Sequence, residues 1–275
     1  MATSRHIFDL ATQPLLSIVP PTYLSIIPQP FLPRVDAGKL LEKSWYNLGR
    51  GVVNLYASLF FRRSVVYKAP VPAGAKILAA NHPSTTDPFM MNTLVPEPVS
   101  ILIIEHFFKL PVVGTSLRHT GQIRVDCANG RPSLEKGIQA LREGRTVGIF
   151  PEGIISPLNG GTHRAHSGVA RLALSTFAPI IPVGIAVDAR RVKQIVTKVD
   201  GTDEVGTWYL RGPYAITVGE PVFFHGSVDN YEHVRTVTEQ IMQRIVALSA
   251  ESAERLRAAS GIQLAADSER LPTEG

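Results

Sequence analysis

Residues 76–87 read KILAANHPSTTD, and this stretch decides how the rest of the chain is organised. Its apolar run, Ile77 to Ala80, predicts a short buried strand that delivers His82 into a turn rich in Pro, Ser and Thr. On a continuous helix His82 and Asp87 would point about 140° apart, but in a turn that opens into a helix they can meet. Asp87 then accepts from one imidazole nitrogen and leaves the other free as a base. The alternative is that the pair only ties the turn together.

A second apolar stretch also ends in a charged turn. Residues 147–153 read VGIFPEG, and Ser156 follows shortly after them. In a sheet with parallel strands, the ends of the strands converge on one edge, where ligands bind. We therefore expect the two turns to form one site.

These two turns together resemble the glycerolipid acyltransferase family, which includes the 1-acylglycerol-3-phosphate acyltransferases. The family's N-H-x4-D motif stands intact at residues 81–87, and its F-P-E-G-x-x-S motif at residues 150–156. The run IPVGI at residues 181–185 is similar to the family's late apolar motif, and the resemblance covers roughly residues 65–225. It implies transfer of a fatty acyl group from acyl-CoA or acyl-carrier protein to a lysolipid hydroxyl, with 1-acylglycerol-3-phosphate as the default acceptor and no cofactor.

Acyl transfer from a thioester to an alcohol makes two physical demands. The alcohol must lose its proton as it attacks, and the carbonyl oxygen gathers negative charge that needs hydrogen-bond donors. We assign His82 as the general base and Asp87 as the residue that orients the ring and stabilises the imidazolium. A positioned base accelerates such a step by roughly 10²–10⁴-fold. Because no serine stands in a nucleophile-elbow sequence and Cys127 has no evident base nearby, we expect direct attack without a covalent intermediate.

The remaining residues of the two turns are expected to bind the acceptor. Glu152 either accepts from an acceptor hydroxyl or fixes a loop, and Gly153 allows close approach of the backbone. Ser156 either donates to a phosphate or caps a turn. Asn81 belongs to the same substrate-binding set.

Three positions that carry positive charge in the family are changed in this chain. Cys127 stands where the second motif, G-x-x-x-x-D-R, has its arginine, and Ile154-Ile155 replaces the Thr-Arg of the third. His166 matches a lysine that usually precedes the glycine at Gly168. Since arginine forks suit phosphate and apolar side chains do not, the acceptor is left open. The acceptor is either a phosphate-bearing lysolipid or a less charged lysolipid or lipid alcohol. A further alternative is that the chain is a catalytically silent lipid-binding protein.

Three arginines lie near enough in the sequence to replace the missing charges. Arg124, Arg131 and Arg164 are candidates to bind a substrate phosphate, or they are ordinary surface arginines. Metal binding is the competing use of the acidic and histidine side chains. No H-x-x-x-H or H-E-x-x-H spacing supports it, so no metal site is expected.

The pattern of apolar residues predicts an α/β fold with a largely parallel central sheet flanked by helices. The expected strands are 65–67, 76–80, 99–104, 122–125, 146–150, 180–187, 208–210 and 215–218. The expected helices are 88–94, 132–143, 168–177 and 234–256. These elements form an acyltransferase domain at residues 65–261, followed by a disordered tail at 262–275.

The N-terminal part, residues 1–64, is expected to be an apolar arm followed by an amphipathic helix. Residues 11–33 carry no charge, but their prolines argue against a spanning helix. The arm therefore lies on a membrane surface or packs on the domain. Beyond it, apolar residues recur at alternating steps of four and three and form one helical stripe, which packs on the domain or sits at a membrane interface. That stripe consists of Leu41, Trp45, Leu48, Val52, Leu55 and Leu59.

The composition sets the kind of partner to expect. The chain has 275 residues, a formal net charge of +5 and a pI near 9.4, which favours an anionic partner such as a membrane surface or a phosphorylated substrate. No basic stretch is interleaved with aromatic residues, so nucleic acid is not expected. The single cysteine, Cys127, excludes an internal disulfide. We expect peripheral association with the cytoplasmic face of a membrane.

Overall fold

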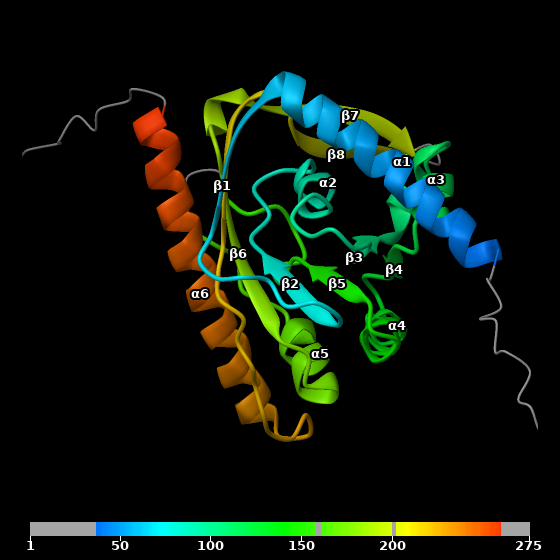
Figure 1. Ribbon diagram of the computed structural model, residues 1–275, viewed down its shortest axis with the longest axis vertical. Coiled ribbons are helices and arrows are strands. Elements are labelled where there is room, and N and C mark those ends of the chain that lie inside the picture. The colour runs from blue at the N-terminus through cyan, green and yellow to red at the C-terminus, as the bar shows by residue number, and fades with distance from the viewer. Residues whose placement is uncertain (1–36, 158–160, 200–201, 260–275) are drawn as a thin grey trace, which may run out of the picture. The chain divides into compact units, whose positions relative to one another are not determined.

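The computed structural model describes residues 37–157, 161–199 and 202–259 (Figure 1). The arm predicted before residue 37 and the tail predicted at 262–275 lie outside the described residues. The chain divides into two units, Met1–Lys39 and Leu40–Gly275. Only residues 37–39 of the first unit are described, as the start of a helix, so the fold reported below is that of the second.

A seven-stranded sheet runs through this unit in the order β1-β9-β6-β2-β5-β3-β4. All neighbouring strands pair in parallel except β6 and β9, which are antiparallel. The largely parallel α/β fold is therefore confirmed. The strands are β1 (Phe61–Tyr67), β2 (Lys76–Ala80), β3 (Val99–Ile104), β4 (Ile123–Val125), β5 (Thr146–Ile149), β6 (Ile180–Val187) and β9 (Gly212–Val218).

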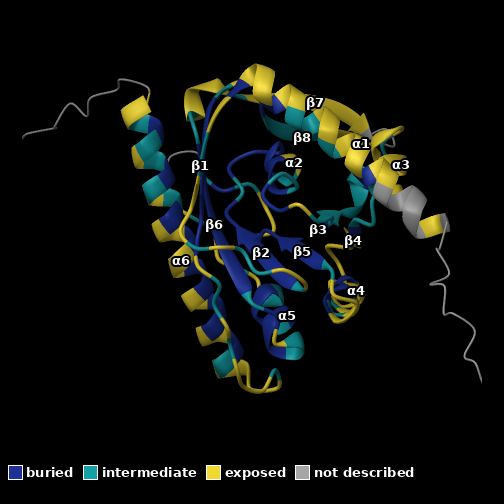
Figure 2. Ribbon diagram, in the orientation of Figure 1, coloured by how far each residue is buried: buried dark blue, intermediate teal, exposed yellow. Residues whose placement is uncertain are grey.

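Helices cover both faces of the sheet. They are α1 (Ala37–Phe60), α2 (Asp87–Met91), α3 (Val113–His119), α4 (Arg131–Arg142), α5 (Gly168–Thr176) and α6 (Tyr231–Ala259), with 3₁₀ turns η3 (Glu105–Lys109) and η4 (Ala189–Arg191). Alternate residues of β2 face opposite cores, as the pleat requires. Ile77 and Ala79 pack with α4, α5 and α6, whereas Leu78 and Ala80 pack with α1, α2 and β8. Figure 2 shows the buried central strands between these layers.

The central strands were predictable because they are buried on both sides and read as continuous apolar runs. The strands predicted at 76–80, 99–104 and 180–187 match β2, β3 and β6 residue for residue. The bounds of the edge strand β1 were predicted less accurately. β1 begins at Phe61, ahead of the strand expected at 65–67, so the expected domain boundary at residue 65 falls inside that strand.

A two-stranded antiparallel hairpin, β7 (Val192–Val199) and β8 (Thr202–Tyr209), stands apart from the main sheet. The sequence predicted only a strand at 208–210, which is wrong in extent. Residues of β7 are mostly exposed, so they carry no alternation of buried and exposed positions that a periodicity reading could detect. The missed hairpin matters because it reaches the histidine turn.

Helix α1 attaches to the unit through the face opposite its apolar stripe. Tyr46 is buried, its hydroxyl donates to Asn92 Oδ1 at 2.9 Å, and it accepts from the Val99 N–H at 3.1 Å. The predicted stripe is exposed over its described members, from 45% at Trp45 to 70% at Leu59. The helix therefore packs on the domain, as one of the two readings expected, but it does so through the opposite face and leaves the described part of the stripe exposed. Among the described helices, none is both long and apolar enough to cross a membrane.

Candidate active site

The histidine turn brings His82 and Asp87 together. Strand β2 ends just before the turn and α2 begins at Asp87, so the chain reverses between the two residues. His82 Nδ1 lies 3.0 Å from Asp87 Oδ2. The expectation that the two side chains meet is confirmed. The Asp87 side chain is fully buried, while that of His82 is 16% exposed, and no described residue hydrogen bonds its Nε2.

Asp87 is held by more than the histidine. Its Oδ2 also accepts from the Ser84 N–H at 2.7 Å, and its Oδ1 accepts from the Ser84 hydroxyl at 2.9 Å. The fourth donor is the Tyr214 hydroxyl, 2.5 Å from Oδ1. A buried carboxylate is costly unless its lone pairs are satisfied, and these contacts satisfy both oxygens. The carboxylate is thus fixed in a position to hold the imidazole.

Tyr214 is a member of this cluster that sequence reasoning missed. It lies on β9, is 1% exposed and belongs to the same core as Met90. Burial and the charge of Asp87 raise the pKa of the Tyr214 hydroxyl well above its usual range, so it remains a proton donor to the carboxylate. A single tyrosine in an apolar strand, far along the chain, carries no local signal of this contact.

The second turn packs directly on the first. The rings of His82 and Phe150 stack with centroids 4.1 Å apart. The His82 N–H donates to the Ser156 hydroxyl, and the Ser156 N–H donates to the His82 carbonyl, both at 2.8 Å. The predicted convergence of the two turns on one edge of the sheet is confirmed. Ser156 therefore links the two turns by two hydrogen bonds to His82.

Glu152 holds Ser156 in this position. It is 2% exposed, its Oε1 accepts from the Ser156 hydroxyl at 2.5 Å, and its Oε2 accepts from the His163 N–H at 2.7 Å. Of the two roles open to Glu152, the contacts are those of a residue that fixes loops. The Ser156 hydroxyl is likewise occupied within the protein, which corresponds to the turn-capping alternative.

Gly153 follows directly and borders the open space beside His82. Its φ is +70°, and a Cβ there would stand 3.0 Å from Cδ2 of His166. Any other residue would combine backbone strain with crowding. Glycine therefore lets the second turn pass close to His166.

Asn81 joins two strands of the sheet. Its Nδ2 donates to the Ile185 carbonyl at 2.9 Å, and its Oδ1 accepts from the Ile185 N–H at 2.7 Å. The amide is 5% exposed and is used at both ends by the backbone of β6. Its expected role in binding substrate stays a prediction, and the contacts are those of a scaffold residue.

Two adjoining cavities share His82. One, of about 280 Å³, is closed on one side by the β7–β8 hairpin; the other, of about 180 Å³, is more apolar and runs beneath α2 and α3. The hairpin is fastened to the histidine turn, because the Thr85 N–H donates to the Thr207 carbonyl at 2.7 Å. Both cavities are lined by His82, Thr85, Ile104, Phe107, Leu110, Gly153 and Trp208. The histidine thus faces an apolar slot and a wider cleft at once.

Known proteins share both the sequence and the fold of this region. The family model "Acyltransferase" matches residues 62–186. The 1-acyl-sn-glycerol-3-phosphate acyltransferase of Borreliella burgdorferi is 33% identical over 110 residues, 39% of this chain and 44% of that protein. This chain is therefore similar to the acyltransferase family over residues 62–186. It spans less than half of that relative's length.

Two further comparisons extend the match along the chain. The 1-acyl-sn-glycerol-3-phosphate acyltransferase of Bacillus subtilis is 24% identical over 188 residues, 66% of this chain and 85% of that protein. The crystal structure of the 1-acyl-sn-glycerophosphate acyltransferase PlsC from Thermotoga maritima has a TM-score of 0.53 at 22% identity. It covers 82% of this chain and 84% of the other. The acyltransferase fold therefore extends well beyond the matched family region.

The arginines expected to bind phosphate are not gathered at this candidate site. Arg124, on β4, has a side chain 57% exposed and lies 3.6 Å from Glu105. Arg131, at the start of α4, is 84% exposed and pairs with Glu135. Arg164 lines a different cavity, against α6. None of the three arginines lines the cavities at His82, and their expected role in binding substrate stays a prediction.

The cavities at His82 carry little positive charge. Across the described residues, neither is lined by a lysine or an arginine, and the wider one includes Glu204 from β8 and His106 from η3. The positions changed relative to the family agree with this pattern, since Ile154 and Ile155 line the same cleft. The open space beside the histidine is therefore suited to uncharged and apolar groups.

Proposed function

We propose that this chain transfers a fatty acyl group from a thioester, acyl-CoA or acyl-carrier protein, to the hydroxyl of a lipid. The observation that carries the proposal is the His82–Asp87 pair, whose carboxylate is buried while its imidazole borders a cavity. The names of its relatives support acyl transfer as the reaction class.

In the proposed mechanism, His82 removes the proton of the acceptor hydroxyl. Asp87 accepts the hydrogen bond from Nδ1–H, which fixes the tautomer and leaves Nε2 as the base. The alcohol oxygen attacks the thioester carbonyl, an ester bond forms, and the carbon–sulfur bond breaks. The departing thiolate takes the proton from the imidazolium, which Asp87 stabilises while it exists.

The apolar cavity beside His82 is suited to the part of the acyl chain nearest the carbonyl. Its walls include Pro88 and Phe89 from α2, Leu102 and Ile103 from β3, and Trp208 from β8. Burying methylene groups against such walls is favourable by about 0.8 kcal/mol each. A thioester whose chain enters this slot would bring its carbonyl close to the histidine.

Two acceptors are proposed. The first is 1-acylglycerol-3-phosphate, which the names of the relatives support. The second is a less charged lysolipid or lipid alcohol, favoured by the cleft's lack of lysine and arginine among the described residues and by Glu204. A phosphate in the cleft would lie near the Glu204 carboxylate, and no arginine or lysine among the described lining residues would bind it.

Association with the cytoplasmic face of a membrane is part of the proposal. The exposed stripe of α1 offers Leu48, Val52, Leu55 and Leu59, each more than 60% exposed. Such a contiguous apolar helix face is typical of interfacial helices. An enzyme that acts on a lipid acceptor needs this kind of contact, because its substrate seldom leaves the bilayer.

Incubating the purified chain with radiolabelled acyl-CoA and a panel of acceptors tests this function. We expect an acylated lipid product, with 1-acylglycerol-3-phosphate as the preferred acceptor under the first reading and monoacylglycerol or a neutral lysolipid under the second. The absence of product with every donor and acceptor would overturn the proposal and leave a lipid-binding protein.

A further inference from the structure

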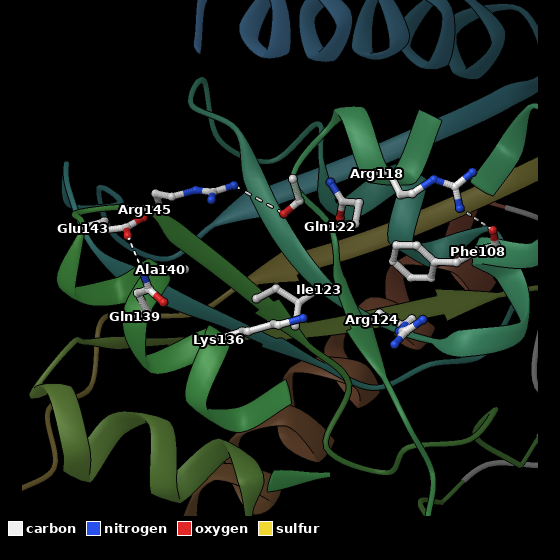
Figure 3. Close-up of a pocket in the computed structure, with 11 residues that line it drawn as sticks. Phe108, Arg118, Gln122, Ile123, Arg124, Lys136, Gln139, Ala140, Glu143 and Arg145 are labelled. Carbon is white, nitrogen blue, oxygen red and sulfur yellow. Dashed lines mark hydrogen bonds between the residues drawn. The ribbon is translucent and has the colours of Figure 1, made fainter. Parts of the chain in front are cut away.

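A separate cavity, of about 480 Å³, lies along the outer edge of the sheet between β4, α3 and α4 (Figure 3). Four cationic side chains line it, against a single carboxylate. The cations are Arg118, Arg124, Lys136 and Arg145, and the carboxylate is Glu143. The positive charge of this cavity contrasts with the space around His82, which no described lysine or arginine lines. A cavity of this kind attracts anions.

Two of these cations, Arg118 and Lys136, make no ion pair with an acidic side chain among the residues that the structure describes. Arg118 donates to the Phe108 carbonyl at 2.7 Å and to the Thr115 hydroxyl at 3.3 Å, which are neutral acceptors. Arg124 forms an ion pair with Glu105 at 3.6 Å, a distance too long for a hydrogen bond. Lys136 makes no ion pair with any residue that the structure describes. In the view of Figure 3, Lys136 lies between Arg145 at one end and Arg118 and Arg124 at the other.

The rest of the lining suits a molecule that carries both an aromatic ring and negative charge. Phe108, Ile123 and Ala140 provide apolar wall, while Gln122 and Gln139 provide amide groups. An aromatic base with phosphates attached needs this combination of flat apolar surface, amide partners and cations. The cavity is also large enough for a nucleotide rather than for an isolated phosphate.

One 3₁₀ turn forms the wall between this cavity and the site. Of two successive residues in η3, Phe107 lines both cavities that contain His82, and Phe108 lines the basic cavity. In the sheet, β5 and β3 separate β2 from β4, so the strands next to the two sites lie three strand spacings, roughly 14 Å, apart across the sheet. A pantetheine arm is of that order of length.

We propose that this basic cavity binds the phosphorylated nucleotide of a CoA donor, with the pantetheine arm crossing η3 so that the thioester reaches His82. This rests on the proposed acyl transfer and specifies its donor. It also gives Arg124 a place in substrate binding different from the acceptor-phosphate role expected from the sequence.

Charge reversal of the cavity, with two donors compared, tests the proposal. We expect Lys136→Glu and Arg124→Glu each to raise KM for acyl-CoA by about tenfold or more, with kcat changed little. With acyl-pantetheine, which lacks the nucleotide, KM should no longer distinguish these variants from the wild type. Arg244→Glu is the matched control, because it reverses an arginine on α6 that lines none of these cavities.

Direct binding separates this proposal from the proposed reaction. Calorimetric titration with adenosine 3′,5′-diphosphate should give binding to the wild type and to Arg244→Glu, and weakened binding to Lys136→Glu. No binding by the wild type, or an equal KM for acyl-CoA in all variants, would overturn the nucleotide site even if acyl transfer occurs. Use of an acyl-carrier protein alone as donor, with KM raised by Lys136→Glu, would overturn it in favour of an acidic protein partner. Nucleotide binding without any transfer would instead count against the reaction and not against the site.

Discussion

The cavities around His82 and the cavity beside β4 differ in charge although one 3₁₀ turn separates them. The described walls at His82 contain no lysine or arginine, while those beside β4 contain four such side chains. Positive charge is thus placed away from the histidine, and the group at which chemistry is proposed borders cavities with largely apolar walls. Such a division suits a substrate whose reactive carbonyl and charged head lie far apart.

The two regions also differ in how firmly their polar groups are held. At the histidine turn, buried hydrogen bonds fix Asp87, Ser84 and Ser156. At the basic cavity, Arg124 and Lys136 are exposed. A preorganised site favours catalysis because its groups need not rearrange in the transition state, whereas long exposed cations suit an ionic contact screened by salt.

The largest expected effect is at the buried carboxylate. Asp87→Asn should lower kcat by roughly 10²–10⁴-fold, because a neutral amide neither stabilises the imidazolium nor selects the required tautomer. Steady-state rates with the preferred acceptor measure this, with Asp229→Asn, an exposed acid, as control. A decrease below tenfold would show that the pair does not act as a unit.

Placing a cation in the neutral cleft sharpens the contrast between the cavities. Ile155→Arg restores the arginine of the family pattern, and we expect it to raise the preference for 1-acylglycerol-3-phosphate over monoacylglycerol by about tenfold. Val196→Arg, on the exposed part of β7, is the matched control. The ratio of kcat/KM for the two acceptors is the measurement, and an unchanged ratio would place acceptor selection elsewhere.

Tyr214→Phe tests whether the hydrogen bonds around Asp87 matter for activity and for stability. Removing the hydroxyl should lower kcat several-fold and the free energy of unfolding by about 1.5–3 kcal/mol. Tyr231→Phe, an exposed tyrosine, should change neither.

The same variant has a pH signature. The pKa of the Tyr214 hydroxyl is raised in the folded protein by burial and by Asp87, so above pH 10 the unfolded chain loses this proton before the folded one. The free energy of unfolding should therefore fall as pH rises above 10, and less steeply in Tyr214→Phe. Equal slopes for the two proteins in denaturant titrations would contradict the assignment.

The apolar stripe of α1 distinguishes the lipid substrate from the soluble donor. Leu48→Ser and Leu55→Ser remove exposed apolar surface and should raise the apparent KM for a vesicle-borne acceptor a few-fold, with KM for acyl-CoA unchanged. Their unfolding midpoints should stay close to that of the wild type, because surface substitutions alter stability by about 0.5 kcal/mol or less. Co-sedimentation with vesicles checks the same point, and undiminished binding would place the membrane contact elsewhere.

Sequence reasoning located the histidine turn and the central strands because both are local. A buried parallel strand is a run of apolar residues, and a turn that follows it is visible in the same stretch. It could not find Tyr214 or the β7–β8 hairpin, because the former is defined by a distant contact and the latter is largely exposed.

The roles of single polar residues were also beyond the sequence. Asn81 and Glu152 stand in motif positions, yet their buried polar groups are used by the Ile185 backbone and by Ser156 and His163. The arginines were misplaced for the opposite reason. Arg124 and Arg164 are near the motifs along the chain, but β4 and the segment before α5 carry them to different cavities.

The most direct test of the central claim is the rate of acyl transfer by His82→Ala, measured beside its unfolding curve and compared with His233→Ala on α6. We predict a loss of roughly 10²–10⁴-fold with cooperative unfolding retained, and no loss in the control. His82→Gln, which keeps a polar side chain, serves if the alanine variant fails to fold. A folded His82 variant that retains a rate within tenfold of the wild type would contradict the claim.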